Sequence, residues 1–302
     1  MQRLALCHKR GLLRPWISLC LIISLSFAQV LAANANVSKN GRTEDTDNLA
    51  LYSNAALVID DNSGAILYDK NIDSAHSVAS LTKLMTALVV LESGISLEAT
   101  IRVENDDIDM ERGSRSKMRI GEILPRRDML RLALMSSENR AASALARTFP
   151  GGREAFVAVM NQRALQIGMR ATSFVDSTGL SNRNISTARD MAKLVAAAAR
   201  HELIRDYSTT SKVSLTRLDS GVQISYLNTN LLLRRESGWD IHLSKTGYLN
   251  EAGYCLVLQA VIERRVVNIV LLDSYGRYSR VGDANRIKKW IEQRLSSTSD
   301  KL

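Results

Sequence analysis

The feature that most constrains the fold is the placement of the β-strand patterns, which lie at the two ends of the chain. Near the C-terminus, residues 255–262 (CLVLQAVI) and 266–272 (VVNIVLL) are apolar and rich in β-branched side chains, and a short charged turn separates them. Near the N-terminus, residues 55–60 and 65–68 flank the turn sequence DNSG. Each pair has the pattern of a β-hairpin. We therefore predict two hairpins that are far apart in the sequence.

The middle of the chain has the apolar spacing of helices instead. The predicted helices, with a final amphipathic one, lie at residues 80–94, 130–135, 141–146, 156–167, 191–199 and 283–295. Thr187 with Asp190 resembles a capping box that opens one of them, and weak strand patterns return at 213–215 and 222–226. A sheet built from both chain ends, with a helical insertion between them, is an α+β fold.

The first 35 residues have the layout of a secretory signal peptide. Four basic residues and no acid come first, then the apolar stretch 16–27, and then the small-residue run 32–35 (AANA). This order is typical of a cleaved signal. The alternative is a permanent membrane anchor, which the stretch disfavours because it is shorter than the roughly 20 residues that span a bilayer. We expect residues 1–35 to be removed on export.

Export limits the chemistry that the mature chain can perform. Of the 40 basic and 31 acidic residues, 36 and 31 remain after the signal is removed, so the net charge is +5. A basic surface suits an acidic polymer, whereas nucleic acid is not an expected partner outside the cytoplasm. Cys255 is then the only cysteine, and the four histidines are widely spaced, so we expect neither an intrachain disulfide nor a zinc site.

The first motif that suggests catalysis is Ser80-Leu81-Thr82-Lys83, at the start of a predicted helix. Residues three apart share a helix face, so Lys83 can reach the hydroxyl of Ser80. A lysine acts as a base if burial or a second cation lowers its pKa. Alone the motif is weak, because Ser80 can also be a helix cap. The same spacing recurs in Ser114-Arg115-Ser116-Lys117, where the dense charge predicts a solvated loop.

The second motif is Ser137-Glu138-Asn139, in a predicted loop between helices. A serine and an asparagine two residues apart can point a hydroxyl and an amide into one cleft, where they relay a proton and hold a carbonyl. The alternative is an ordinary capping turn. Ser38-Lys39-Asn40 repeats the spacing in a polar segment, so this motif is also weak alone.

The third motif is Lys245-Thr246-Gly247, which occurs once and is followed by Tyr248. On a strand that lines a cleft, the lysine and threonine would bind a carboxylate. Gly247 would let substrate approach the backbone, and the next N–H would donate into an oxyanion hole. An ordinary turn is the alternative.

The three motifs in this order are the signature of penicillin-recognising serine enzymes. Over about residues 50–295 the chain resembles the low-molecular-mass penicillin-binding proteins, D-alanyl-D-alanine peptidases of the S11 type, and most closely the endopeptidases of the penicillin-binding protein 7 type. The blocks FVDSTGL (174–180) and STARD (186–190) also carry the resemblance. Ser177 departs from it, since proline is expected there.

The resemblance implies a β-lactamase/DD-peptidase-like fold and a division of the chain. A flexible segment would occupy residues 36–50, and the catalytic domain residues 51–295, with a helical subdomain at about 84–205. A polar tail, 296–302, would follow. Larger carboxypeptidases of the family add a C-terminal β domain and a membrane-anchoring helix, and only 55 residues of the chain follow Gly247. We therefore expect a periplasmic enzyme without a stable membrane anchor.

The resemblance also implies a mechanism. Ser80 would attack a D-alanyl carbonyl in a cell-wall peptide while Lys83 takes its proton. The oxyanion would lie between the N–H groups of Ser80 and Tyr248. Ser137, with Lys245 nearby, would pass a proton to the departing amine. The substrate-binding residues would be Asn139, which orients the acyl side, and Lys245, Thr246 and Gly247 at the carboxylate. No cofactor or metal is implied, and β-lactams would acylate Ser80.

Four activities fit these residues to different degrees. We expect a D-alanyl-D-alanine endopeptidase that cleaves the crosslinks between peptidoglycan peptide stems. A carboxypeptidase that trims pentapeptide stems is the main alternative. A class A β-lactamase would need a deacylating glutamate, and residues 174–190 offer only Asp176 and Asp190. A catalytically silent wall-binding homologue is disfavoured because all the motif residues are intact.

Overall fold

The computed structural model describes residues 49–217, 220–234 and 237–299. Residues from Leu49 onward form one compact unit. The predicted signal peptide, and the predicted flexible segment up to residue 48, lie outside the described residues. So does the end of the predicted polar tail, although its first residues, up to Ser299, continue the last helix.

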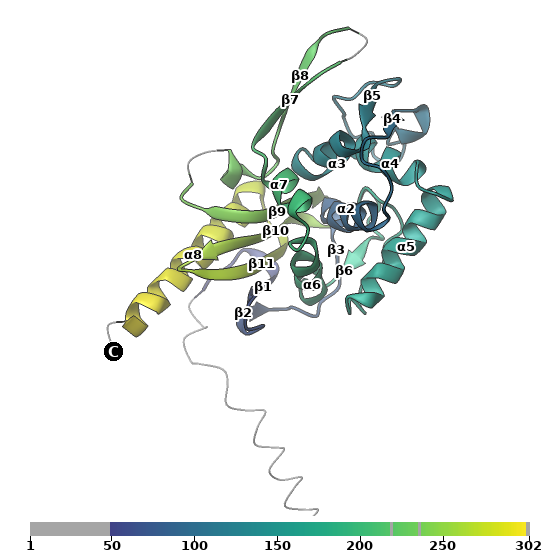
Figure 1. The fold of residues 1–302 in the computed structure, drawn as a ribbon. Helices are drawn as coiled ribbons and strands as arrows, with labels where there is room; N and C mark the ends of the chain where they lie inside the picture. The colour runs from purple at the N-terminus through teal and green to yellow at the C-terminus, as the bar shows by residue number, and fades with distance from the viewer. Residues whose placement is uncertain (1–48, 218–219, 235–236, 300–302) are drawn as a thin grey trace, which may run out of the picture. The chain divides into compact units, whose positions relative to one another are not determined.

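The two predicted hairpins meet in one antiparallel sheet of five strands, ordered β2-β1-β11-β10-β9 (Figure 1). Its strands are β1 (Ser53–Asp60), β2 (Ile66–Lys70), β9 (Asp240–Leu249), β10 (Gly253–Ile262) and β11 (Arg265–Ser274). The N-terminal hairpin joins the C-terminal strands through β11, where Leu57 pairs with Val270. The α+β fold with a sheet from both chain ends is confirmed.

The strands β10 and β11 are mostly apolar because helices cover both faces of the sheet. Side chains of a strand alternate between faces. Leu256 and Leu258 pack with Ile287 of the C-terminal helix α8 (Arg277–Ser299), whereas Val257 and Val270 pack into the core of the helical part. Each fully buried aliphatic side chain stabilises the fold by about 1.5–3 kcal/mol. The sheet is therefore the platform on which the rest of the molecule is fixed.

The helical part lies on the sheet face opposite α8 (Figure 1). Its helices are α2 (Lys83–Glu92), α3 (Arg126–Met135), α4 (Asn139–Arg147), α5 (Gly152–Gln166), α6 (Ala188–Ala198) and α7 (Glu202–Thr209). Helix α2 is central, and eight of its ten residues are buried. Thr187 caps α6 by accepting from the N–H of Asp190 at 3.1 Å, which is half of the predicted capping box. The carboxylate of Asp190 accepts from the Ala171 N–H and the Thr172 hydroxyl instead. No helix among the described residues is both long and apolar enough to cross a bilayer.

Short elements complete the fold. Three two-stranded sheets pair β3 (His76–Ser77) with β6 (Ile185–Ser186), β4 (Thr100–Arg102) with β5 (Ile123–Pro125), and β7 (Lys212–Thr216) with β8 (Gln223–Leu227). The 3₁₀ helices are η2 (Ala79–Thr82), η3 (Asn105–Asp107) and η4 (Leu231–Leu233). The C-terminal helix begins at Arg277, six residues before the predicted start.

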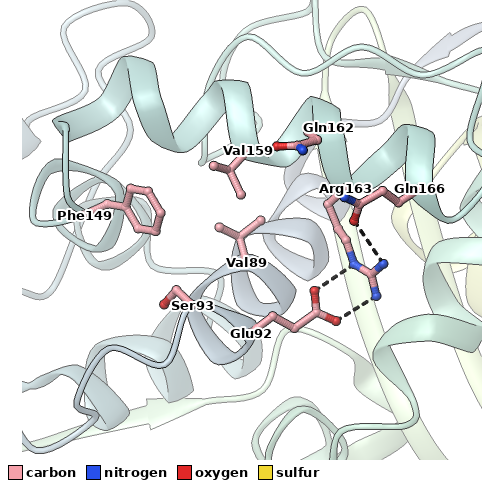
Figure 2. A pocket seen from close by; sticks show the side chains of 8 residues that line it. All are labelled: Val89, Glu92, Ser93, Phe149, Val159, Gln162, Arg163 and Gln166. Atoms are coloured by element: carbon pink, nitrogen blue, oxygen red, sulfur yellow. Dashed lines mark hydrogen bonds and ion pairs between the residues drawn. The ribbon is translucent and has the colours of Figure 1, made fainter.

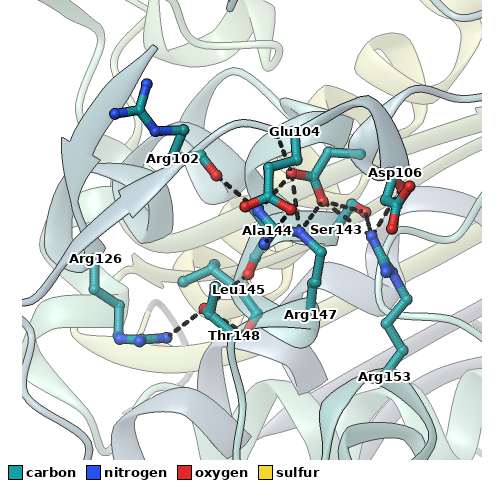
Figure 3. A network of polar contacts seen from close by, with 11 residues as sticks. Arg102, Glu104, Asp106, Arg126, Ser143, Ala144, Leu145, Arg147, Thr148 and Arg153 are labelled. Atoms are coloured by element: carbon teal, nitrogen blue, oxygen red, sulfur yellow. Dashed lines mark hydrogen bonds and ion pairs between the residues drawn. The ribbon is translucent and has the colours of Figure 1, made fainter. Parts of the chain in front are cut away.

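A buried carboxylate fixes helix α4 (Figure 3). The side chain of Asp107, which is fully buried, accepts from Arg147 at 2.9 Å, from Arg153 at 3.0 Å and from the hydroxyl of Ser143 at 3.0 Å. A buried charge is tolerated only when it is paired in this way. The network ties α4 to η3, and Asn139 is the first residue of α4.

Candidate active site

Ser80 and Lys83 lie at the junction of η2 and α2, where the turn brings them together. The amine of Lys83 is fully buried and makes three hydrogen bonds. It lies 2.9 Å from Ser80 Oγ, 2.7 Å from Asn139 Oδ1 and 2.5 Å from the carbonyl oxygen of Thr178. The helix start thus presents a serine hydroxyl beside an amine that is shielded from water.

Burial lowers the pKa of the Lys83 amine to about 7, although the carboxylates of Asp176, Glu138 and Asp109 oppose the shift. Near neutral pH a large fraction of this amine is therefore uncharged, as a base must be. The sequence suggested burial and a second cation as two possible causes of a lowered lysine pKa, and for Lys83 the cause is burial. Repulsion between the lysines acts on Lys245, whose pKa is held well below its usual range by burial and then by Lys83.

Two glycines press against the turn that carries Ser80. A Cβ on Gly179 would lie 1.9 Å from the carbonyl oxygen of Ala79, and one on Gly247 would lie 3.0 Å from that of Val78. Ala79 itself has a positive φ of 46°, a value that residues with a side chain rarely adopt. The lack of a side chain at Gly247 therefore makes room for the Ser80 turn, whereas the sequence interpretation assigned that space to substrate.

Ser137 and Lys245 come together from opposite parts of the chain. Ser137, between α3 and α4, has a φ of 60°, an uncommon value for a residue with a side chain. Lys245, on β9, is buried, and its amine lies 3.0 Å from Ser137 Oγ and 3.0 Å from the carbonyl oxygen of Thr246. Strain of this kind persists only where the surroundings hold it, often at functional sites.

The loop at residues 114–117, for which we predicted solvent exposure, packs on the second motif. The prediction of solvent exposure is therefore wrong for its two serines. Ser114 Oγ accepts from Asn139 Nδ2 at 2.8 Å. The buried carboxylate of Glu138 accepts from Ser116 Oγ at 2.6 Å and from the Lys117 N–H at 3.2 Å. Because Ser114 holds the amide nitrogen of Asn139, the amide oxygen faces Lys83.

A cleft of about 400 Å³ opens above these groups. Six of the predicted site residues line it, namely Ser80, Ser137, Asn139, Thr246, Gly247 and Tyr248. The buried lysines Lys83 and Lys245 do not line the cleft themselves, but they are hydrogen-bonded to Ser80 and Ser137, which do. The side chain of Tyr248 is 49% exposed and stacks on Tyr254, with ring centroids 4.3 Å apart.

The cleft also contains residues that the sequence interpretation missed, and three of them are arginines. Arg280 is buried and donates to the carbonyl oxygens of Gly247 and Cys255, both at 2.8 Å. Burial lowers the pKa of Arg280 to about 10, so it stays charged at neutral pH. Arg234 and Arg277 line the same end of the cleft.

No described carboxylate lies within 4.0 Å of the guanidinium nitrogens of Arg234, Arg277 or Arg280. Guanidinium groups are well suited to binding a carboxylate in this setting. No sequence pattern marks these arginines, because Arg234 follows η4, Arg277 and Arg280 lie in α8, and all three reach the cleft only through the fold. Among the described residues, no three His, Cys, Asp or Glu side chains gather into a possible metal site.

Comparison with known proteins gives matches over most of the chain. Residues 41–276 match the family model of peptidase S11, described as D-alanyl-D-alanine carboxypeptidase. A D-alanyl-D-alanine endopeptidase of Pseudomonas aeruginosa is 45% identical over 80% of this chain and 78% of its own. One of Escherichia coli is 40% identical over 91% and 87%. The structure of the Streptomyces K15 DD-transpeptidase, 28% identical, covers 80% of this chain and 97% of its own with a TM-score of 0.74.

Proposed function

The chain belongs to peptidase family S11 and is a serine D-alanyl-D-alanine peptidase, and from this we propose that it is an endopeptidase that cleaves the peptide crosslinks of peptidoglycan. The two relatives at 45% and 40% identity are both named D-alanyl-D-alanine endopeptidases. The proposed location is the periplasm, which the predicted signal peptide supports.

We assign the nucleophile to Ser80 and the base to Lys83. The neutral amine of Lys83 accepts the hydroxyl proton while Ser80 Oγ bonds to the substrate carbonyl carbon. The carbonyl electrons move to oxygen, and the N–H groups of Ser80 and Tyr248 stabilise the resulting oxyanion. The distance of 2.9 Å between the two side chains lets this proton transfer occur directly.

Breakdown of the tetrahedral intermediate needs a proton on the departing nitrogen. Ser137 supplies it, and the Lys245 amine at 3.0 Å replaces the proton that Ser137 gives up. The C–N bond then breaks and leaves an ester on Ser80. Transfer to Lys245 of the proton that Lys83 took from Ser80 restores both lysines. A water molecule then attacks the ester carbonyl, the neutral Lys83 amine takes the water proton, and this proton returns to Ser80 Oγ as the ester C–O bond breaks, which releases the acid product and regenerates the enzyme.

The polar groups at the two ends of the cleft orient the substrate. Asn139 binds the peptide on the acyl side. Its amide is fixed in position for this by hydrogen bonds to Lys83 and Ser114. Thr246 and Lys245 bind the carboxylate next to the departing nitrogen, and Arg280 adds a positive charge to that end. A β-lactam carries a carboxylate at the matching position and would acylate Ser80. The solved penicillin-binding protein D2 of Listeria monocytogenes, with a TM-score of 0.68, was crystallised in a cefotaxime-bound form.

The observation that carries this proposal is the amine of Lys83 at 2.9 Å from Ser80 Oγ, in a cleft that is also lined by Ser137, whose hydroxyl is hydrogen-bonded to Lys245. Digestion of purified crosslinked muropeptides tests it. Release of monomers that keep an intact pentapeptide end is expected. Loss of the terminal D-alanine without crosslink cleavage would instead show a carboxypeptidase. Absence of both reactions, and of tagging by fluorescent penicillin, would show a silent wall-binding protein.

A further inference from the structure

A second cavity, of about 440 Å³, adjoins the arginine end of the catalytic cleft. Arg234 lines both spaces, and the neighbouring residues Arg277 and Tyr278 of α8 line one each. The second cavity lies between η4 and α8. Its lining residues are Leu231, Leu232, Arg234, Ser237, Tyr278, Val281 and Asn285. The two spaces therefore adjoin at Arg234.

The lining of this cavity suits a peptide chain with methylene groups and carboxylates. Leu231, Leu232 and Val281 provide an apolar wall, and the Asn285 amide is polar and accessible. Arg234 adds a positive charge with no described carboxylate within 4.0 Å. A guanidinium at the border of an apolar space is a typical anchor for a carboxylate.

Another cavity, of about 310 Å³ between α2 and α5, has no lining arginine without a described carboxylate partner (Figure 2). Its arginine, Arg163, is already paired with Glu92, at 2.7 Å and 2.8 Å. It also shares no lining residue with the catalytic cleft. The cavity at Arg234 is distinguished by a lining residue shared with the cleft and by an arginine that hydrogen-bonds the Asn228 carbonyl oxygen through Nε but has no described carboxylate partner.

We propose that the cavity between η4 and α8 binds the departing peptide stem of the crosslink, with Arg234 holding a carboxylate of that stem. The inference rests on the proposed function. Trimming a terminal residue and cutting a crosslink differ in what the departing nitrogen carries, a single D-alanine or a whole second stem. The carboxylate next to that nitrogen binds at Arg280, so the rest of the stem must continue past the arginine end of the cleft, where this cavity begins.

Filling the cavity from its two walls tests the proposal. Asn285→Trp places a large side chain into it from α8, and Leu231→Trp does so from η4. Asn285→Ala is the matched control, because it removes the same amide, with its 2.9 Å hydrogen bond from Trp239, but leaves the space open. Each variant is assayed for cleavage of a purified crosslinked muropeptide dimer and for acylation by fluorescent penicillin, which has no second stem.

We expect each tryptophan variant to lower kcat/KM for the dimer at least tenfold and to leave penicillin acylation within twofold. Asn285→Ala should lower kcat/KM for the dimer less than Asn285→Trp does, because it removes a polar contact but leaves the space open. Equal losses in both assays for both tryptophan variants, or no loss of dimer cleavage in either of them, would overturn the proposal. Penicillin acylation also reports folding, so a misfolded variant is recognised by its loss of acylation. In that case the tryptophan variant on the other wall of the cavity tests the proposal. A wild-type enzyme that is tagged by penicillin but leaves the dimer intact would refute the endopeptidase function itself, which is a distinct result.

Discussion

Two segments of the molecule carry a serine followed three residues later by a lysine, and they differ in the surroundings of the lysine. In the first, Lys83 lies on the buried helix α2, with its amine 2.9 Å from Ser80 Oγ. In the second, Lys117 lies in an exposed loop, and its amine contacts the Ser225 carbonyl oxygen at 2.8 Å and the ring of Tyr226. Only the first pair brings a hydroxyl and an amine together.

The difference shows that burial, rather than spacing, makes a lysine into a base. Water stabilises a charged amine, so an exposed lysine keeps its proton at neutral pH. On α2 the protein core has replaced that water, and the pKa of Lys83 falls to about 7. The loop segment has a separate role, since its serines hold Asn139 and Glu138 in place.

The largest effect should come from removing the hydroxyl of the buried pair. Ser80→Ala should lower both penicillin acylation and crosslink cleavage by at least about 10⁴-fold, as loss of a serine nucleophile does elsewhere. Ser114→Ala removes the hydroxyl at the same motif position in the loop and should lower acylation only about tenfold. Gel fluorescence after labelling with fluorescent penicillin measures this, and residual tagging of Ser80→Ala would place the nucleophile elsewhere.

The second largest difference between the two segments should appear in the acylation rate when each lysine is changed to arginine. Lys83→Arg keeps the positive charge but removes the base, because arginine stays protonated, so acylation should fall by about 10³-fold. Lys117→Arg keeps an exposed charge and should change acylation less than about twofold. Rates of acylation by a chromogenic β-lactam measure both. Similar losses in the two variants would contradict the comparison.

The pH dependence of kcat/KM should show the titration of the buried amine. Since the pKa of Lys83 is lowered to about 7, the amine is neutral above that pH and protonated below it. Activity should therefore fall about tenfold per pH unit below pH 7 and level off above it. An acid limb centred near pH 4 or pH 10 would show that a different group is the base.

The smallest effect concerns the loop serine that holds the Asn139 amide. Ser114→Ala removes an acceptor at 2.8 Å, so the amide can turn its nitrogen toward Lys83, and acylation should fall about tenfold. Ser114→Thr retains the hydroxyl and should restore most of the rate. Arg115→Ala, in the same exposed loop, is the control and should have no effect. Failure of threonine to rescue would indicate a merely structural role.

Strands were predictable from the sequence where burial on both faces requires a run of apolar residues. Residues 255–262 and 266–272 became β10 and β11 because a sheet covered on both faces needs continuous apolar runs. The early start of α8 was not predictable. Its first turn is held by the buried guanidinium of Arg280 against the carbonyl oxygens of Gly247 and Cys255, a tertiary contact without periodicity.

The same distinction applies to the site. Ser80 and Lys83 are neighbours along one helix, so their contact follows from spacing. Arg234 and Arg280 reach the cleft from separate elements, and Ser114 reaches Asn139 across 25 residues of sequence. The charge around Ser114 predicted solvent exposure, which holds for Arg115 and Lys117 but not for the serines that point to the motif.

The strand order in the sheet has a consequence for biogenesis. The last strand, β11, lies between β1 and β10, so the N-terminal hairpin cannot join the other strands until synthesis has reached residue 274. Lys245 and Gly247, the neighbours of Ser137 and of the Ser80 turn, also lie in this late portion. A nascent polypeptide that stops short of this portion therefore lacks the contacts around Ser80 and Ser137, and the candidate site can assemble only after β11 has been made.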